Sequence, residues 1–155
     1  MKVQRVYIDT SVIGGCLDQE FAVWSKGLLR DFQEGNLLLV VSTTVAAEVA
    51  VAYESVQRQY EDFLLLEPEI LEVTEQAIAL AEAYQQREIL TPKYYTDGLH
   101  IAVATVAQVD VLVSWNFKHI VHFNKIRLFN AVNLEMGYKP IQIYSPREVT
   151  SYGAD

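Results

Sequence analysis

The chain has 155 residues, of which 51% are hydrophobic, so it is long enough for one well-packed domain and too short for two. Its formal net charge of -8 argues against a protein that coats nucleic acid through a broad basic surface. The charge is uneven, because residues 1–90 hold 15 acidic against 6 basic side chains and residues 91–155 hold 5 against 6. The first part is a poor surface for a polyanion, whereas the second leaves room for a compact basic patch.

Membrane insertion and disulfide chemistry are not expected. No apolar run approaches the roughly 20 residues of a membrane span, and residues 1–20 lack the pattern of a signal peptide. The single cysteine, Cys16, excludes an internal disulfide and a zinc site built from several cysteines. We therefore expect a cytoplasmic protein with no membrane association.

The first predicted strand ends in a carboxylate. Apolar residues within 3–8 predict a short strand, and Thr10, Ser11 and the glycines at 14–15 predict the turn that leaves it. Asp9 therefore stands at the carboxyl end of a strand, which is the edge where ligands bind in open α/β sheets. Asp9 is a functional candidate, with a turn or N-cap aspartate as the alternative.

Strands and helices alternate along the rest of the chain. Apolar spacing predicts helices at 21–34, 45–52, 54–66, 74–88, 97–107 and 124–136. Apolar runs predict buried strands at 37–41 and 110–114, a final strand at 141–144, and a short strand or connector at 68–73. This order predicts a three-layer α/β/α sandwich with a mainly parallel sheet of about five strands. Residues 1–146 are expected to form the single domain, and residues 147–155 a C-terminal tail.

Three further polar residues interrupt apolar elements. Glu48 lies in the middle of the almost wholly apolar helix 45–52, where an unpaired carboxylate would cost several kcal/mol, so we expect a partner beside it. Asp97 falls in the first turn of its helix, where favourable interaction with the helix dipole is the simpler explanation. Asn116 follows the predicted strand 110–114. All three lie at or near a strand end or the adjoining helix turn.

The convergence of these side chains indicates a metal site. Carboxylates that share one cleft repel one another, and a hard divalent cation with oxygen ligands relieves the repulsion. The expected ion is Mg²⁺ or Mn²⁺. Such an ion polarises a phosphoryl oxygen, lowers the pKa of a bound water and orients an in-line attack, so phosphodiester hydrolysis is the chemistry that the cluster favours.

The chain resembles the small single-domain PIN ribonucleases that serve as toxins in VapBC-type toxin–antitoxin pairs. The resemblance covers about residues 3–146. It rests on YIDTSV at 7–12, Glu48 in the helix after the second strand, DGLHIA at 97–102 and DVLVSWNF at 110–117. Each stretch is weak evidence alone, and together they are fairly specific.

The resemblance implies a metal-dependent endoribonuclease, the toxin component of a type II toxin–antitoxin pair. Its catalytic and metal-binding cluster maps onto Asp9, Glu48, Asp97 and Asn116. A PIN-like sheet with the first strand near its centre, a single-stranded or structured RNA substrate, a cognate antitoxin protein and a homodimer are further implications.

The sequence departs from the family pattern at the last position of this cluster. Asn116 stands where the family usually has aspartate, and Ser114 replaces the common threonine. With one negative charge fewer, a second cation should bind more weakly. An active one-metal enzyme and a catalytically weak or inactive RNA- or protein-binding module both remain open, and cleavage of single-stranded RNA with added Mn²⁺ would distinguish them.

Other residues are assigned by their place near the expected cleft. Lys93 and Lys118 lie close in sequence to the cluster and are expected to bind RNA, and Trp115 is a candidate for stacking on bases. Ser11 is expected to bond Asp9 or a phosphate rather than to act as a nucleophile. His100 is interpreted as a packed helix histidine rather than a metal ligand.

Overall fold

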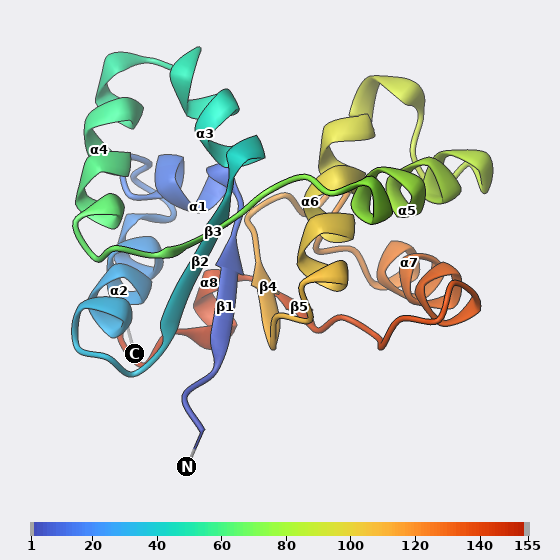
Figure 1. The fold of residues 1–155 in the computed structure, drawn as a ribbon. Helices are drawn as coiled ribbons and strands as arrows, with labels where there is room; N and C mark the ends of the chain where they lie inside the picture. The colour runs from blue at the N-terminus through green and yellow to red at the C-terminus, as the bar shows by residue number, and fades with distance from the viewer. Residues whose placement is uncertain (1, 154–155) are drawn as a thin grey trace.

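Five parallel strands form the centre of the computed structural model, which describes residues 2–153 (Figure 1). Their order across the sheet is β3-β2-β1-β4-β5. The strands are β1 (Arg5–Ile8), β2 (Leu38–Ser42), β3 (Glu69–Leu71), β4 (Val111–Val113) and β5 (Ile143–Tyr144). The parallel α/β sandwich with the first strand at its centre is therefore confirmed, including the short strand within 68–73.

Helices cover both faces of this sheet. They are α1 (Thr10–Gly15), α2 (Ala22–Gln33), α3 (Thr43–Ala50), α4 (Glu54–Leu64), α5 (Glu75–Gln86), the 3₁₀ turn η1 (Pro92–Tyr94), α6 (Tyr95–Val106), α7 (Phe123–Glu135) and α8 (Pro146–Val149). Figure 1 shows α2 and α4 on one side of the sheet and α5, α6 and α7 on the other. Within the described residues, no helix is long and apolar enough to cross a membrane.

The register of the central strands fixes where the polar residues lie. Tyr7 pairs with Val40 on β2 and Leu112 on β4, and both neighbours run parallel to β1. The apolar side chains of these strands are buried because helices cover both faces of the sheet. Asp9 follows Ile8 directly, and its N–H donates to the carbonyl of Val113 at 3.4 Å. Residues that follow β1, β2 and β4 consequently meet at one edge of the sheet.

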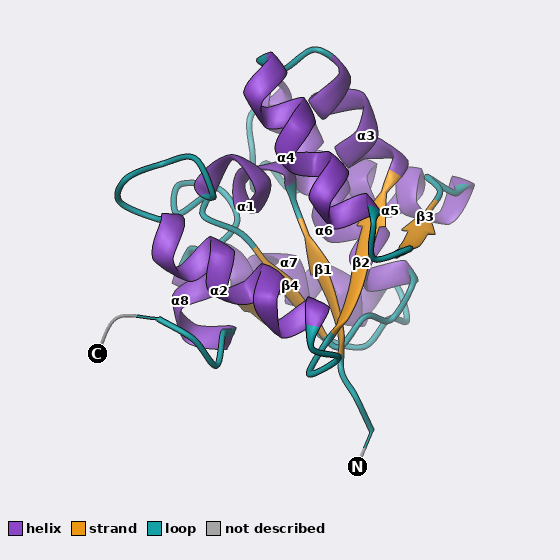
Figure 2. Cartoon of the chain, turned by 90° about the vertical axis from the view of Figure 1, so that its left-hand side faces the viewer, coloured by secondary structure: helices purple, strands orange, loops and turns teal. Residues whose placement is uncertain are grey.

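The segment after β1 differs from prediction, because residues 10–15 form helix α1 instead of a turn. Its two glycines are tolerated within this short helix, and Gly15 serves packing. A Cβ atom at Gly15 would lie 2.5 Å from Ser25 Oγ and 2.6 Å from Trp115 Nε1. Figure 2 shows α1 and α3 at the end of the sheet toward which β1 and β2 run. The close packing at Gly15 ties α1 to α2 and to the loop after β4.

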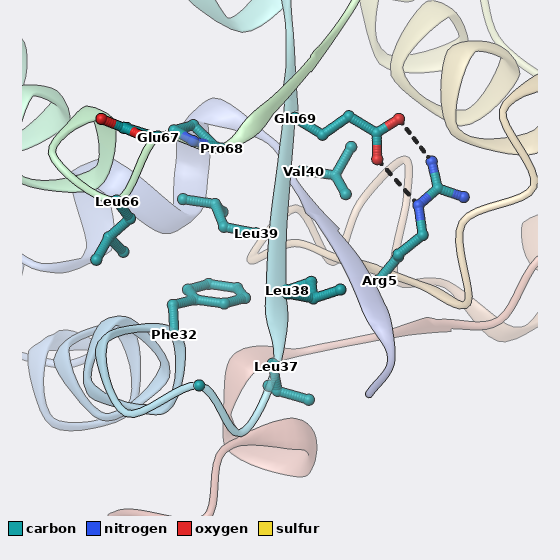
Figure 3. Close-up of a pocket in the computed structure, with 11 residues that line it drawn as sticks. Arg5, Phe32, Leu37, Leu38, Leu39, Val40, Leu66, Glu67, Pro68 and Glu69 are labelled. Carbon is teal, nitrogen blue, oxygen red and sulfur yellow. Dashed lines mark hydrogen bonds and ion pairs between the residues drawn. The ribbon is translucent and has the colours of Figure 1, made fainter. Parts of the chain in front are cut away.

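An ion pair that passes across β2 links the edge strand β3 to β1. Arg5 on β1 bonds Glu69 on β3 through two contacts, Nε to Oε1 at 3.0 Å and Nη2 to Oε2 at 2.9 Å (Figure 3). A cavity of about 230 Å³ lies beside this pair, lined largely by apolar side chains such as Phe32 and Leu39. Arg5 begins β1, whereas Asp9 follows its end. This hollow is therefore separate from the edge where the polar residues gather.

The described part of the predicted tail, residues 147–153, packs on α2, whereas residues 154–155 lie outside the described chain. The buried carboxylate of Asp31 on α2 accepts the Thr150 hydroxyl at 2.7 Å, the Ser151 N–H at 2.9 Å and the Asn36 amide at 3.0 Å. Burial acts to raise the pKa of Asp31, but these hydrogen bonds lower it overall. The tail is therefore held by a carboxylate that is stable in its ionised form.

Replacing Asp31 by Ala should lower the free energy of unfolding by about 1–3 kcal/mol, because three hydrogen-bond donors lose their buried, ionised acceptor. Since the folded-state pKa of Asp31 is depressed, its contribution is present above the unfolded pKa of about 3.9 and is lost as the pH falls. Urea unfolding at neutral pH measures the change. The exposed Asp62→Ala is the control, and an unfolding midpoint for Asp31→Ala equal to that of the control would contradict the assignment.

Candidate functional site

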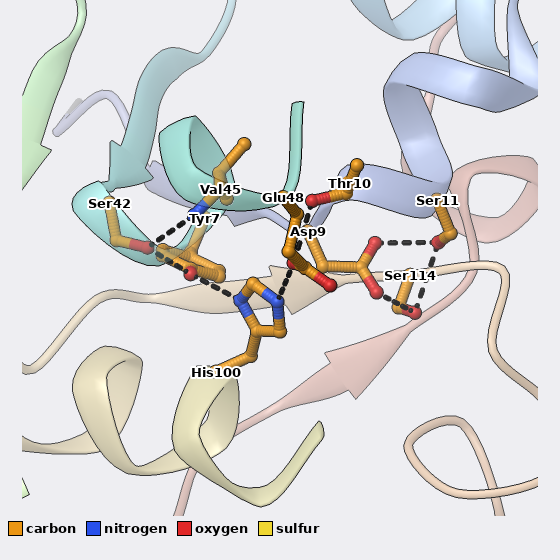
Figure 4. Close-up of polar contacts among 9 residues, drawn as sticks. All are labelled: Tyr7, Asp9, Thr10, Ser11, Ser42, Val45, Glu48, His100 and Ser114. Carbon is orange, nitrogen blue, oxygen red and sulfur yellow. Dashed lines mark hydrogen bonds and ion pairs between the residues drawn. The ribbon is translucent and has the colours of Figure 1, made fainter. Parts of the chain in front are cut away.

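Three carboxylates reach the carboxyl edge of the sheet from different elements. Asp9 follows β1, Glu48 lies on α3 after β2, and Asp97 lies in the first turn of α6. Figure 4 shows the side chains of Asp9 and Glu48 near His100 of α6. Each acid also contributes to the pKa shifts of its neighbours through charge, so the three share one electrostatic environment.

Asp9 is only 4% exposed and is held by two serine hydroxyls. Ser11 donates to Oδ1 at 2.6 Å and Ser114 donates to Oδ2 at 2.7 Å (Figure 4). Ser11 in turn accepts the N–H of Trp115 at 2.8 Å, and Ser114 accepts the N–H of Asn116 at 2.9 Å. Burial raises the pKa of Asp9, while the charge of the nearby histidine and these hydroxyls oppose the shift. Ser11 therefore bonds Asp9, one of the two partners expected from the sequence, and its contact with RNA stays a prediction.

The structure supplies the partner that was expected beside Glu48, in the form of Thr10 and His100. The Thr10 hydroxyl donates to Oε1 of Glu48 at 2.8 Å, and His100 Nε2 lies 2.6 Å from the same oxygen. Burial acts to raise the pKa of Glu48, but the hydrogen bond and charge of His100 and the bond from Thr10 lower it overall. Glu48 is consequently the carboxylate of the three that is most easily kept ionised without a metal.

His100 is buried at 2% exposure, as a packed helix histidine would be, yet both of its ring nitrogens are engaged. Nδ1 lies 2.6 Å from the hydroxyl of Tyr7, and that hydroxyl lies 2.7 Å from Oγ of Ser42. Burial acts to lower the pKa of His100, but its bond to Glu48 and the charges of the three acids raise it overall. The interpretation of His100 as a packing residue was therefore incomplete.

Two of these partners could have been found in the sequence. Tyr7 stands two residues before Asp9, so the two side chains extend to the same face of an extended strand. His100 stands one turn after Asp97 on the same face of a helix. The spacing in the sequence therefore indicated that Tyr7 and His100 lie near the acids, whereas only the structure shows which atoms are bonded.

Asp97 and Asn116 form the other side of the site. Burial raises the pKa of Asp97, and the charge of His119 and a hydrogen bond from the Asn116 side chain oppose the shift. The oxygen of Asn116 accepts the N–H of His119 at 2.9 Å. The oxygen of Asn116 is therefore directed to the backbone, and its side chain opposes the rise in the Asp97 pKa. Its role as a metal ligand stays a prediction.

The carboxylate oxygens of the site are ligands that a hard cation prefers, but they do not form a complete coordination shell. Among residues 2–153, no group of three or more His, Cys, Asp or Glu side chains is close enough to hold a metal ion by itself. Mg²⁺ commonly keeps several waters and takes only one or two protein carboxylates, so an open arrangement of this kind is compatible with it. Asp9 and Asp97 fit this requirement best, because burial raises the pKa of both and a cation would favour their ionised forms.

The predicted RNA-binding residues have different surroundings. The ammonium groups of Lys93 and Lys118 lie 5.6 Å and 5.7 Å from the ring centre of Tyr94. His119 packs on the same ring, with 3.8 Å between centroids, so the fold gathers these residues beside Asp97. Trp115, by contrast, is 8% exposed and donates to Ser25 Oγ at 2.8 Å. We therefore correct the assignment of Trp115 to RNA, because its indole belongs to the core.

Replacing Asp97 by Asn should stabilise the fold at neutral pH, because it removes a carboxylate whose ionised form burial disfavours. Since the folded-state pKa of Asp97 is raised, the parent loses stability relative to the variant as the pH rises above about 3.9. The difference in melting temperature should thus grow between about pH 4 and neutral pH. Calorimetry without added metal measures it, and a difference that does not change with pH would contradict the expected ionisation.

Comparison with solved structures identifies the fold. A chain of FitAcB from Neisseria gonorrhoeae matches with a TM-score of 0.59 at 16% identity, over 93% of this chain and 99% of that one. A chain of VapBC2 from Rickettsia felis, bound to a DNA fragment from their promoter, gives 0.57 at 14% identity, over 91% and 98%. VapC20 from Mycobacterium tuberculosis, described as a Sarcin-Ricin loop cleaving toxin, gives 0.55 at 14% identity, over 88% and 98%.

No protein-family model matches the sequence, and a search of curated proteins gives no match either. The structural likeness extends over nearly the whole of each matched chain. The resemblance noted in the sequence is confirmed at the level of the fold: this chain has the fold of the VapC-like PIN-domain toxins.

Proposed function

We propose that this protein is a divalent-metal-dependent endoribonuclease that hydrolyses phosphodiester bonds in single-stranded or structured RNA. The observation that carries the proposal is that Asp9, Glu48 and Asp97 lie at the same carboxyl edge of the sheet on three different elements. A fold does not by itself specify chemistry, so the acids supply the argument for phosphodiester hydrolysis. The solved toxin described as cleaving the Sarcin-Ricin loop supports RNA as the class of substrate.

Each acid has a proposed role that follows from its surroundings. When bound, Mg²⁺ or Mn²⁺ polarises the phosphoryl group and makes a coordinated water easier to deprotonate. Asp9 and Asp97 hold the cation, because neither is bonded to a cationic side chain among the described residues. Glu48 would hold the cation less directly and would accept a proton from the attacking water.

Asn116 is proposed to orient Asp97 through its amide and to leave the site with three carboxylates in place of four. A lower negative charge favours one cation over two. The same feature supports the second candidate, a catalytically weak or inactive RNA- or protein-binding module. Because both candidates would bind RNA, a measurement of turnover distinguishes them and a measurement of RNA binding alone does not.

The proposed biological setting is a type II toxin–antitoxin pair. Among the matched structures are a toxin–antitoxin complex from Klebsiella pneumoniae and FitAB bound to a DNA fragment. We propose a cognate antitoxin and a homodimer for this chain as well. A basic side chain of the antitoxin, placed among Asp9, Glu48 and Asp97, would replace the charge of the cation and exclude it.

Replacing Asp9 by Asn should abolish RNA cleavage, with a loss of at least about a hundredfold, because the variant lacks a metal-binding carboxylate while keeping the shape of the side chain. The measurement is cleavage of a labelled single-stranded RNA with and without Mn²⁺. Circular dichroism should report an unchanged fold.

The matched control is Asp62→Asn, which makes the same chemical change at an exposed position on α4. It should cleave like the parent. Parent-like turnover in Asp9→Asn would refute the proposed mechanism. A parent protein that binds RNA but never cleaves it, with Mn²⁺ present, would favour the binding module.

RNA is expected to approach past Tyr94, where Lys93 and Lys118 gather. Among residues 2–153 neither lysine forms a salt bridge, whereas Arg5, Arg30, Arg58 and Arg87 each do. Lys125 lies next to this group, with its ammonium 3.2 Å from Nδ1 of His119. Unpaired ammonium groups beside an acidic cluster offer a phosphate backbone the least repulsive approach to the site.

Reversing the charge of both Lys93 and Lys118 to Glu should weaken single-stranded RNA binding and flatten its salt dependence, because two phosphate contacts are lost. Fluorescence anisotropy across a salt series measures both quantities, and the affinity for Mn²⁺ should change little. The control is Lys26→Glu with Lys139→Glu, which makes the same change in net charge at two other exposed positions. Equal affinity and salt slope in the two double variants would exclude this entry path.

A further inference from the structure

A continuous series of hydrogen bonds begins and ends on helix α3. The N–H of Val45, in the first turn of α3, donates to Ser42 Oγ at 3.3 Å, and Ser42 Oγ lies 2.7 Å from the hydroxyl of Tyr7. That hydroxyl lies 2.6 Å from Nδ1 of His100, and Nε2 of His100 lies 2.6 Å from Oε1 of Glu48 (Figure 4). Glu48 is itself on α3, so the series closes on the helix where it began.

The series has a consistent direction when His100 is neutral. Nε2 carries the hydrogen, because the carboxylate of Glu48 can only accept. Nδ1 then accepts from Tyr7, Tyr7 accepts from the Ser42 hydroxyl, and Ser42 accepts from Val45. Every buried donor in the series thus has an acceptor. If Nδ1 were protonated as well, Nε2 would still donate to Glu48, so the hold on the carboxylate is the same in both forms.

The two oxygens of Glu48 have different surroundings. His100 and Thr10 both bond Oε1, and among the described residues no hydrogen bond is formed to Oε2. The Glu48 side chain keeps 38% of its surface exposed, whereas His100 keeps 2%. The buried histidine thus holds Oε1 of Glu48 from the protein side, and Oε2 is the oxygen left without a protein partner on the partly exposed carboxylate.

We infer that His100 is a positioning residue that fixes Oε1 of Glu48, so that Oε2 is the oxygen presented to water or to a cation. The inference rests on the proposed function for what Oε2 does, and on geometry alone for where it lies. Direct metal binding by His100 does not fit, since both ring nitrogens are occupied and the ring is buried. Tyr7 and Ser42 act one step further back by holding the orientation of the ring.

A pair of substitutions separates the two ring nitrogens of His100. In Gln the amide nitrogen is as many bonds from Cα as Nε2 is in His, so His100→Gln keeps a donor for Glu48 and loses the acceptor for Tyr7. In Asn the side-chain oxygen matches Nδ1, so His100→Asn keeps the acceptor for Tyr7 and loses the donor for Glu48. Both variants are smaller than the parent and each breaks one bond of the series.

Calorimetric titration of metal-free protein with Mn²⁺ is the first measurement. His100→Asn should bind Mn²⁺ about 10- to 100-fold more weakly than the parent, the usual effect of removing a group that orients a metal-binding side chain. His100→Gln should stay within a few-fold of the parent. With RNA, the loss in His100→Asn should appear in kcat and leave KM for RNA unchanged.

A merely structural role for His100 gives a different pattern. The two variants would then lose Mn²⁺ affinity in proportion to their loss in melting temperature, with no advantage for Gln. That pattern, or parent-like affinity in His100→Asn, would overturn the inference.

Crystal structures of both variants keep the inference testable even if the parent neither binds Mn²⁺ nor cleaves RNA, a result that would refute the proposed function alone. The Glu48 side chain should leave its parent orientation in His100→Asn and keep it in His100→Gln. A Glu48 side chain unmoved in His100→Asn would overturn the positioning role whatever the activity of the parent.

Discussion

Parallel pairing of β1 with both β2 and β4 is the constraint on which the site depends. Because all three strands run in one direction, the residues at their carboxyl ends lie along a single edge. Asp9, Ser42 and Ser114 are therefore neighbours although they are far apart in the sequence. Two helices add acids to the same edge: α3, which follows β2, carries Glu48, and α6, which precedes β4, carries Asp97.

The three acids differ in how strongly their surroundings disfavour the ionised form. Asp9 and Asp97 have raised pKa values because burial outweighs the donors around them. Glu48 has a lowered pKa because His100 and Thr10 both bond the same oxygen. A cation at the site would therefore stabilise the ionised forms of Asp9 and Asp97 more than that of Glu48. Glu48 keeps its charge without a cation, which is consistent with the proposed division of the acids into two metal ligands and a base.

The sequence predicted the elements better than it predicted the contacts between them. Asp9 and Glu48 were conspicuous because each interrupts an apolar run, and apolar runs are what set the period of helices and strands. Residues 10–15 were predicted as a turn from two glycines, but the packing of Gly15 against Trp115 stabilises a helix there. Trp115 was assigned to the cleft because it lies close in sequence to the site residues. Its backbone is near the site, but its indole packs in the core.

The substitution of Asn for the usual acid at position 116 illustrates the same limit. From the sequence it is the loss of one negative charge, whereas in the structure Asn116 also accepts a backbone N–H beside the carboxylate of Asp97. Its oxygen accepts the N–H of His119 at 2.9 Å, and its side chain favours the ionised form of Asp97. A carboxylate in this place could accept the N–H but would repel Asp97 unless a cation lay between them. A neutral amide therefore adds no repulsion beside Asp97, and the arrangement of Asn116, Asp97 and His119 is one that needs no cation between the side chains.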